Sequence, residues 1–154
     1  MAEYSANAIQ IVNPGESVVF TESPEPCTKG LVRHRDGSGN FLLSGWSPFR
    51  GCCYRKRKNA SYLIDFGANI SVPEGGTVEA ISLALTIDGS TVPASSMIAT
   101  PAAVNEYFNV SRAIDVDIWS GCCESITVRN TSSQPIQVQN ANIIFSRPDL
   151  NVTY

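Results

Sequence analysis

The sequence has one histidine and two tryptophans in 154 residues, and it lacks any apolar run near the roughly 18 residues that span a membrane. It also lacks an excess of basic residues. The formal charge of −3 and the pI near 5.1 argue against a general nucleic-acid-binding protein, which normally needs a strongly basic surface. Residues 1–16 hold neither a basic n-region nor an apolar h-region, so we expect no secretory signal. We therefore expect synthesis in the cytoplasm and no binding to membranes or nucleic acids.

The scarcity of histidine argues against an enzyme. Asp36 is too close to His34 in sequence to orient its imidazole in a catalytic triad, and no nucleophile-elbow pattern of glycines occurs. Residues 36–40, DGSGN, match the first three oxygen positions of a calcium loop, but Phe41 stands where that loop needs glycine. We interpret this segment as a hairpin turn, and we expect no catalytic residue, cofactor or metal site.

Five cysteines are the one reactive set in the chain, and two adjacent pairs each follow a glycine: Cys52 with Cys53 and Cys122 with Cys123. Neighbouring residues in a strand point to opposite faces, whereas zinc ligands two to four residues apart converge on one ion. We expect structural thiols, because the chain is made in a reducing compartment and Cys27 is left over. One cysteine of each pair should face the core. A bridge between the two pairs and metal binding stay open as alternatives.

Glycines and prolines interrupt the chain regularly, and the runs between them are rich in Val, Ile, Thr and Ser, which is typical of short strands. Ile126 and Val128 alternate with polar residues, as in a sheet with one buried face. Asp88 and Gly89 predict a two-residue hairpin turn. The expected strands are residues 8–12, 16–21, 30–34, 40–43, 62–70, 77–87, 109–116, 125–130, 136–139 and 142–146.

A single short helix is expected at residues 101–108, with Thr100 as its cap and Pro101 in its first turn. About ten evenly spaced strands and at most one short helix predict an all-β fold, a jelly-roll β-sandwich. We expect one domain over residues 1–154, with flexible tails near residues 1–7 and 147–154.

Several segments carry a resemblance to known families: NPGESVVFTES, PCTKGLVRHRDGSGNF, VPEGGTVEAISLALTIDG, TPAAVNEYFNV and GCCESITVRNTS. Over residues 8–146 the chain resembles a group of small proteins encoded by tailed bacteriophages and prophages. Its second half is also similar to the complement-type and tumour-necrosis-factor-like jelly rolls at the tips of bacterial spore filaments.

This resemblance implies a homotrimer on a particle surface, located in the virion after synthesis in the host cytoplasm. We expect a non-enzymatic capsid decoration or head-surface protein, a fibre or a cap, whose partners are further copies of itself and other virion proteins such as the major capsid protein. Aromatic residues dominate buried contacts between proteins. The candidate interface residues are Tyr107, Phe108, Trp119 and Phe145.

Two further features suggest partners. A basic run concentrates positive charge on four successive residues, Arg55, Lys56, Arg57 and Lys58. Such a run can protect a sheet edge from aggregation, or it can attract an acidic surface such as another virion protein or a cell-envelope polyanion. Trp46 lies in an expected loop and could stack on a sugar. The alternative function is therefore a head domain that binds a host glycan or receptor, on a particle or on a spore filament.

Overall fold

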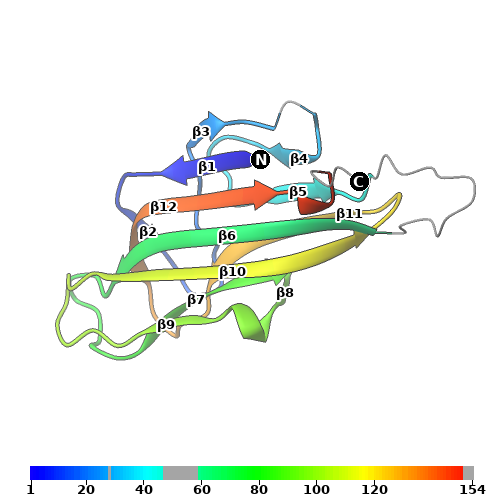
Figure 1. The fold of residues 1–154 in the computed structure, drawn as a ribbon. Helices are drawn as coiled ribbons and strands as arrows, with labels where there is room; N and C mark the ends of the chain where they lie inside the picture. The colour runs from blue at the N-terminus through cyan, green and yellow to red at the C-terminus, as the bar shows by residue number, and fades with distance from the viewer. Residues whose placement is uncertain (28, 47–58, 151–154) are drawn as a thin grey trace, which may run out of the picture.

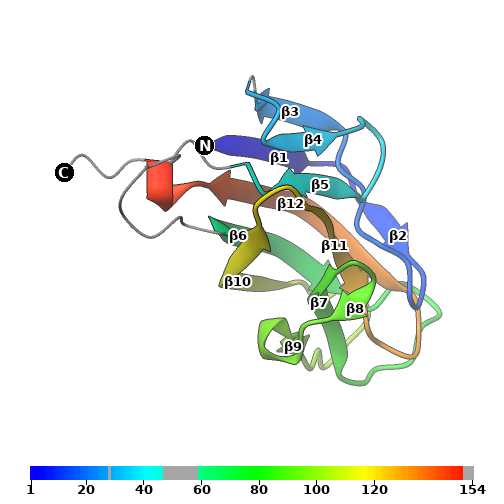
Figure 2. The ribbon, with the colours of Figure 1, turned by 90° about the vertical axis from the view of Figure 1, so that its right-hand side faces the viewer.

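The computed structural model describes residues 1–27, 29–46 and 59–150, which form two antiparallel sheets packed face to face (Figures 1 and 2). The strands are β1 (Ala2–Ala6), β2 (Gln10–Val12), β3 (Glu22–Glu25), β4 (Val32–His34), β5 (Phe41–Ser44), β6 (Asn59–Ser71), β7 (Ile81–Ile87), β8 (Ser90–Thr91), β9 (Met97–Ala99), β10 (Phe108–Trp119), β11 (Cys123–Asn130) and β12 (Ile136–Ser146). Two single turns of 3-10 helix, η1 (Pro93–Ser95) and η2 (Pro148–Leu150), complete the described elements.

The first sheet has the strand order β10-β6-β12-β1-β3, and β2 also pairs with β12. The second sheet has the order β4-β5-β11-β7-β8, and β9 also pairs with β7. The longest pairing joins β10 to β6 without interruption, from Phe108 opposite Ile70 to Trp119 opposite Asn59. Because β10 is the last strand of the path, its free edge forms one margin of the first sheet.

The hydrophobic core lies between the sheets and takes one side chain in two from each long strand. Along β6 every second residue from Ala60 to Ile70 is buried, and the residues between them are half-buried. The largest fully buried side chains come from both sheets: Tyr62, Phe20, Phe41, Phe145, Leu43, Ile64, Ile70, Ile81, Leu83, Leu85, Ile118 and Ile126.

The predicted all-β fold is confirmed, and so are its clearest local patterns. Ile126 and Val128 are fully buried on the same face of β11. Asp88 and Gly89 have φ values of 46° and 81°, the left-handed conformation that a two-residue hairpin turn requires, and they join β7 to β8. Among the described residues, no helix is long and apolar enough to cross a lipid bilayer.

The prediction of a helix at residues 101–108 is wrong. The carboxylate of Glu106 accepts hydrogen bonds from the backbone N–H groups of Ala102 (2.7 Å) and Ala103 (3.1 Å) and so closes a turn. Asn105 has a φ of 57°, and its N–H donates to the carbonyl oxygen of Val72. In a helix over these residues the Asn105 N–H would donate to the Pro101 carbonyl oxygen, so its bond to Val72 and its positive φ exclude the helix.

The predicted strand boundaries also change. Residues 16–21 form no regular strand, because they pair only through isolated bridges at Ser17 and Phe20. The two strands expected at 136–139 and 142–146 are one strand, β12, with a bulge where Asn140 has a φ of 52°.

The expected flexible tails are ordered where the structure describes them. Ala2, Tyr4 and Ala6 are buried, and β1 pairs with β12 along its whole length. At the other end, Arg147 and Asp149 are buried beside η2. Each segment is held by partners more than a hundred residues away or by a buried ion pair, which local sequence composition does not reveal.

Candidate functional site

The outer face of the first sheet, made of the side chains that point away from the core, is a chemically distinctive surface. On β1, β6, β10 and β12 the residues of this face alternate with residues that point into the core. On β3, Glu22 and Glu25 belong to this face because they pair with Ser5 and Glu3 of β1. Among the described residues it carries six carboxylates, and Arg112 is the basic residue beside them, in the hollow where β10, β6 and β12 meet. The carboxylates are Glu3, Glu22, Glu25, Asp65, Asp115 and Asp117.

Strand register places several of these carboxylates close together. One row crosses five strands, and each of its residues lies opposite the next: Ala113, Asp65, Ile144, Glu3 and Glu25. Residues opposite each other on one face are about 5 Å apart at Cβ. Because carboxylates outnumber basic residues among the described residues of this face, the row gives the first sheet a negative outer potential.

Hydrogen bonds within the sheet hold several of these carboxylates in place. Glu3 accepts a hydrogen bond from the Asn142 amide (2.6 Å), and Glu22 accepts one from Asn7 (3.0 Å). Ser61 donates to Asp117 from the neighbouring strand. The carboxylates are therefore oriented by neutral partners, which leave their negative charge uncompensated.

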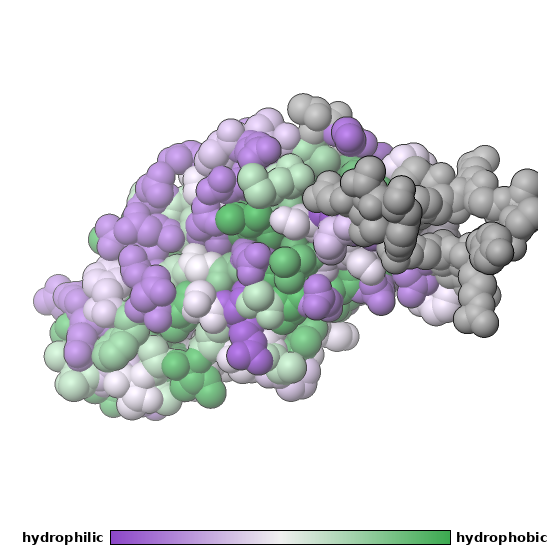
Figure 3. All heavy atoms as spheres, viewed as in Figure 1, coloured by the Kyte–Doolittle hydropathy of each residue, from purple (hydrophilic) through white to green (hydrophobic). Residues whose placement is uncertain are grey.

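A shallow hollow of about 630 Å³ lies on the same face where β10, β6 and β12 meet. Gly67 contributes no side chain there, and Ser111 opposite it contributes a small one. The bulge at Asn140 spreads the neighbouring strand, and the rest of the lining includes Asp65 and Asn142. Figure 3 views this side of the molecule and shows hydrophilic and hydrophobic residues interspersed. Arg112 also lines the hollow, so groups of both charges face it and it is suited to a polar group rather than an apolar ligand.

The four aromatic residues predicted for an interface do not form one patch. Phe108 (37% exposed) and Trp119 (57% exposed) stand at opposite ends of β10, about 36 Å apart at 3.3 Å per residue. Tyr107 is half-buried beside Phe108. Phe145 is only 2% exposed and packs against Phe41 in the protomer's own core, so its prediction as an interface residue is wrong.

The second cysteine pair also departs from prediction, because both Cys122 and Cys123 are exposed and free. Gly121, with a φ of 88°, turns the chain from β10 into β11, so Cys122 lies in the turn and Cys123 opens the strand at the sheet margin. Neither therefore faces the core. Cys52, Cys53 and the basic run Arg55, Lys56, Arg57 and Lys58 lie outside the described residues.

Cys27 is free, half-buried and packed against the core. Burial alone would raise the pKa of its thiol, but hydrogen bonds from the backbone N–H groups of Val32, Lys29 and Leu31 outweigh burial and lower that pKa. A second cavity of about 570 Å³ lies beside this thiol. Among the described residues, no group of three or more Cys, His, Asp and Glu side chains is placed to hold a metal ion.

His34 packs as a structural residue. Its ring stacks on Phe41 with the centroids 4.4 Å apart, and its nitrogens lie 3.2 and 3.3 Å from the carbonyl oxygens of Asn40 and Phe20. Both ring nitrogens therefore meet backbone oxygen atoms.

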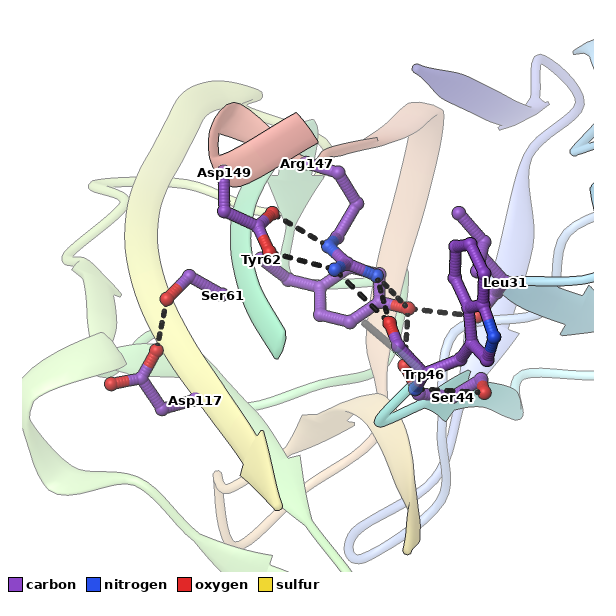
Figure 4. Close-up of polar contacts among 8 residues, drawn as sticks. All are labelled: Leu31, Ser44, Trp46, Ser61, Tyr62, Asp117, Arg147 and Asp149. Atoms are coloured by element: carbon purple, nitrogen blue, oxygen red, sulfur yellow. Dashed lines mark hydrogen bonds and ion pairs between the residues drawn. The ribbon is translucent and has the colours of Figure 1, made fainter. Parts of the chain in front are cut away.

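A buried ion pair that the sequence analysis missed anchors the end of β12 (Figure 4). The Arg147 guanidinium donates to both carboxylate oxygens of Asp149, at 2.8 and 2.7 Å, and both side chains are almost fully buried. The guanidinium also stacks on the Tyr62 ring, 4.7 Å from its centroid, and donates to the Trp46 carbonyl oxygen at 3.2 Å. The Tyr62 hydroxyl in turn donates to the Ser44 carbonyl oxygen at 2.7 Å.

This network fixes the backbone of Trp46 while its side chain stays 53% exposed. Gly45 packs directly against the Trp119 backbone, with no room for a Cβ. The two exposed tryptophans therefore stand on neighbouring backbone segments at one end of the sandwich.

Comparison with known proteins identifies the fold. No protein-family model and no curated protein sequence matches the chain. Among solved structures, it is similar to the globular domain of zebrafish complement 1qA protein, with 11% identity, coverage of 93% of this chain and 94% of that one, and a TM-score of 0.59. It is also similar to Eiger TNF from S. frugiperda, with 11% identity, coverage of 95% and 90%, and a TM-score of 0.64. The predicted jelly roll of the complement and tumour-necrosis-factor type is therefore confirmed as a fold.

The Arg147–Asp149 pair makes stability depend on pH. Burial alone would raise the pKa of the Asp149 carboxyl, but hydrogen bonds from Arg147 outweigh burial and hold that pKa below its usual value of 3.8. A lowered pKa in the folded state gives stability that is present at neutral pH and is lost as the pH falls through that pKa. Asp149→Asn leaves Arg147 buried without its counter-charge and should cost about 3–5 kcal/mol at pH 7.

Urea unfolding of wild type and Asp149→Asn between pH 7 and pH 3 measures this effect. The difference between them should shrink below about pH 4 as the wild-type carboxyl protonates. The matched control Asp115→Asn changes an exposed carboxylate and should alter stability by less than about 0.5 kcal/mol. A difference for Asp149→Asn that stays constant from pH 7 to pH 3 contradicts the assignment.

Proposed function

We propose that this chain is a non-enzymatic, self-associating head domain, a homotrimer whose copies meet through the outer face of the first sheet. The observation that carries the proposal is that the described part of the chain leaves this face open: each outward residue of β10 is exposed, and those of β6 from Asn59 to Asn69 are half-buried. On the second sheet, by contrast, the outward residues Ala84 and Thr86 of β7 are buried by the chain itself. Arg129, directly opposite Ala84, reaches along β7 to the Gly89 carbonyl oxygen.

The free edge of β10 supports a closed ring. A long edge strand presents unpaired backbone groups, and proteins commonly protect such an edge by covering it or by placing charges on it. Head-to-tail contacts around a three-fold axis bring the same two surfaces together in each copy and leave none unmatched. A ring that sets the β10 edge of one copy against the outer face of the next covers each edge.

We also propose a place for the assembly, on the surface of a tailed phage or prophage particle as a decoration, fibre or cap. The resemblance over residues 8–146 supports this location, and the major capsid protein is the partner it suggests. The jelly-roll fold shared with the complement and tumour-necrosis-factor domains suits a head that displays its loops.

Variants on the outer face test the trimer. Light scattering of the wild type should give three times the 16.6 kDa chain mass. Ala113→Arg and Ser111→Arg place a large side chain on the exposed face, midway along β10, and should produce monomers with an unchanged circular dichroism spectrum. The matched control Ser90→Arg, at an exposed position of β8, should remain trimeric. A monomeric wild type, or trimeric face variants, contradicts the proposal.

Mass spectrometry of purified particles tests the location. The chain should be present in a fixed ratio to the capsid protein after density-gradient purification, because symmetric binding sites on a shell are filled stoichiometrically. Free protein at the top of the gradient, with none in the particle band, contradicts the proposed location but leaves the proposed trimer unaffected.

Sugar binding is the second candidate, and the exposed indole of Trp46 on a backbone fixed by Arg147 favours it. A pre-positioned aromatic ring offers a flat apolar surface to a pyranose at little entropic cost. Glycan-array binding should be lost in Trp46→Ala and kept in the control Ile98→Ala, which removes another exposed apolar side chain far from this end. An array without any signal for the wild type rules this candidate out.

A further inference from the structure

Charge is divided unevenly along this chain. Residues 47–58 contain five of the eleven basic residues and no acidic residue. The rest of the chain therefore has six basic against fourteen acidic residues, a formal charge of −8. Two oppositely charged parts of one molecule are thus available to meet, either within one copy or between copies.

The negative charge of the described residues is concentrated on the outer face of the first sheet, which carries six carboxylates. The basic residues within the described ranges do not compensate it. Arg147 is paired with Asp149, and Arg129 lies on the second sheet against β7. Arg112 lines the hollow at the β10 margin of this face and is one cation against six carboxylates, and Lys29, Arg33 and Arg35 lie in or beside β4.

An assembly through this face meets an electrostatic difficulty. Two groups of carboxylates would approach the negative charges of another copy. They are the row with Asp65, Glu3 and Glu25, and the pair Asp115 and Asp117 on β10. Like charges brought together in a region that excludes water repel strongly unless a cation lies between them.

We propose that the basic run, residues 55–58, of one copy docks on the outer face of the first sheet of a neighbouring copy. The inference rests on the proposed self-association and names its electrostatic basis. The run is joined directly to Asn59, the first residue of β6, which lies on this face opposite Trp119. Four residues span up to about 14 Å when extended, enough to cross two or three neighbouring strands of a sheet.

The neighbouring copy is favoured over the run's own face by the geometry of β6. Asn59 is extended and paired with Trp119, so β6 begins at the end of this face. Asp117 and Asp115 of the same copy lie opposite Ser61 and Leu63, further along β6, so the run could reach them only after a chain reversal. A second copy, whose acidic face arrives from outside, needs no such reversal.

Charge reversal tests the contact. The face variant Asp65→Lys, Asp115→Lys, Asp117→Lys and the run variant Arg55→Glu, Lys56→Glu, Arg57→Glu, Lys58→Glu should each weaken association at least tenfold in 50 mM NaCl. The chain that combines both sets should recover association. The matched control Glu74→Lys, Glu79→Lys, Glu124→Lys makes the same charge change away from this face and should leave the run's contact intact.

Salt dependence gives an independent measure. Raising NaCl from 50 to 500 mM shortens the screening length severalfold, so sedimentation velocity should show wild-type association weakened tenfold or more. Association that does not respond to salt, or a face variant that associates like the wild type, overturns the inference.

Isotope-resolved cross-linking then identifies the copy to which the run binds. A carbodiimide joins a lysine amine to a carboxylate with loss of water, so a mixture of ¹⁴N and ¹⁵N protein should give links from Lys56 or Lys58 to Asp115 or Asp117 that combine both isotopes. Links within single-isotope chains only would mean that the run folds onto its own copy, which overturns the inference.

Two further outcomes separate this inference from the proposed function. A wild type that is monomeric at all salt concentrations overturns both. A run variant that still forms wild-type trimers but loses binding to a polyanion such as heparin shows that the run serves a foreign partner, which overturns the inference and leaves the trimer standing.

Discussion

The pairing of β6 with β10 on one side and β12 on the other is the interaction on which the rest of the molecule depends. Because side chains alternate along these strands, the same backbone register that buries Tyr62 and Ile64 also presents Asp65 outward. A shift by one residue would exchange the two faces, exposing the core and burying the carboxylates. The packing of the core therefore fixes the charge pattern of the outer face, and fold and surface chemistry cannot vary independently.

The end of β12 is held by a different kind of interaction. The buried pair of Arg147 and Asp149 draws together η2, the hydroxyl of Tyr62 and the backbone of Trp46, so that segments a hundred residues apart in sequence meet at one end of the sandwich. Tyr62 of β6, the backbone of Trp46 and η2 are thereby fixed relative to one another.

Much of this architecture could be predicted from the sequence, because alternation and turn chemistry are local. Ile126, Val128 and the Asp88–Gly89 turn give the period and the reversals directly. Residues 2–6 could not be identified as a strand, since only pairing with distant β12 creates it. The mistaken helix at 101–108 has the same cause, because its capping signals serve equally well for a turn closed by Glu106.

The outer face illustrates the limit most clearly. The alternation Asp115-Val116-Asp117 does indicate carboxylates on one side of a strand. The placement of Glu3 and Asp65 on either side of β12 follows from register alone. A crystal structure of the assembled wild type tests the account most directly. It should show copies joined through the outer face of β10, β6 and β12. An assembly held together elsewhere, with this face open to solvent, would contradict it.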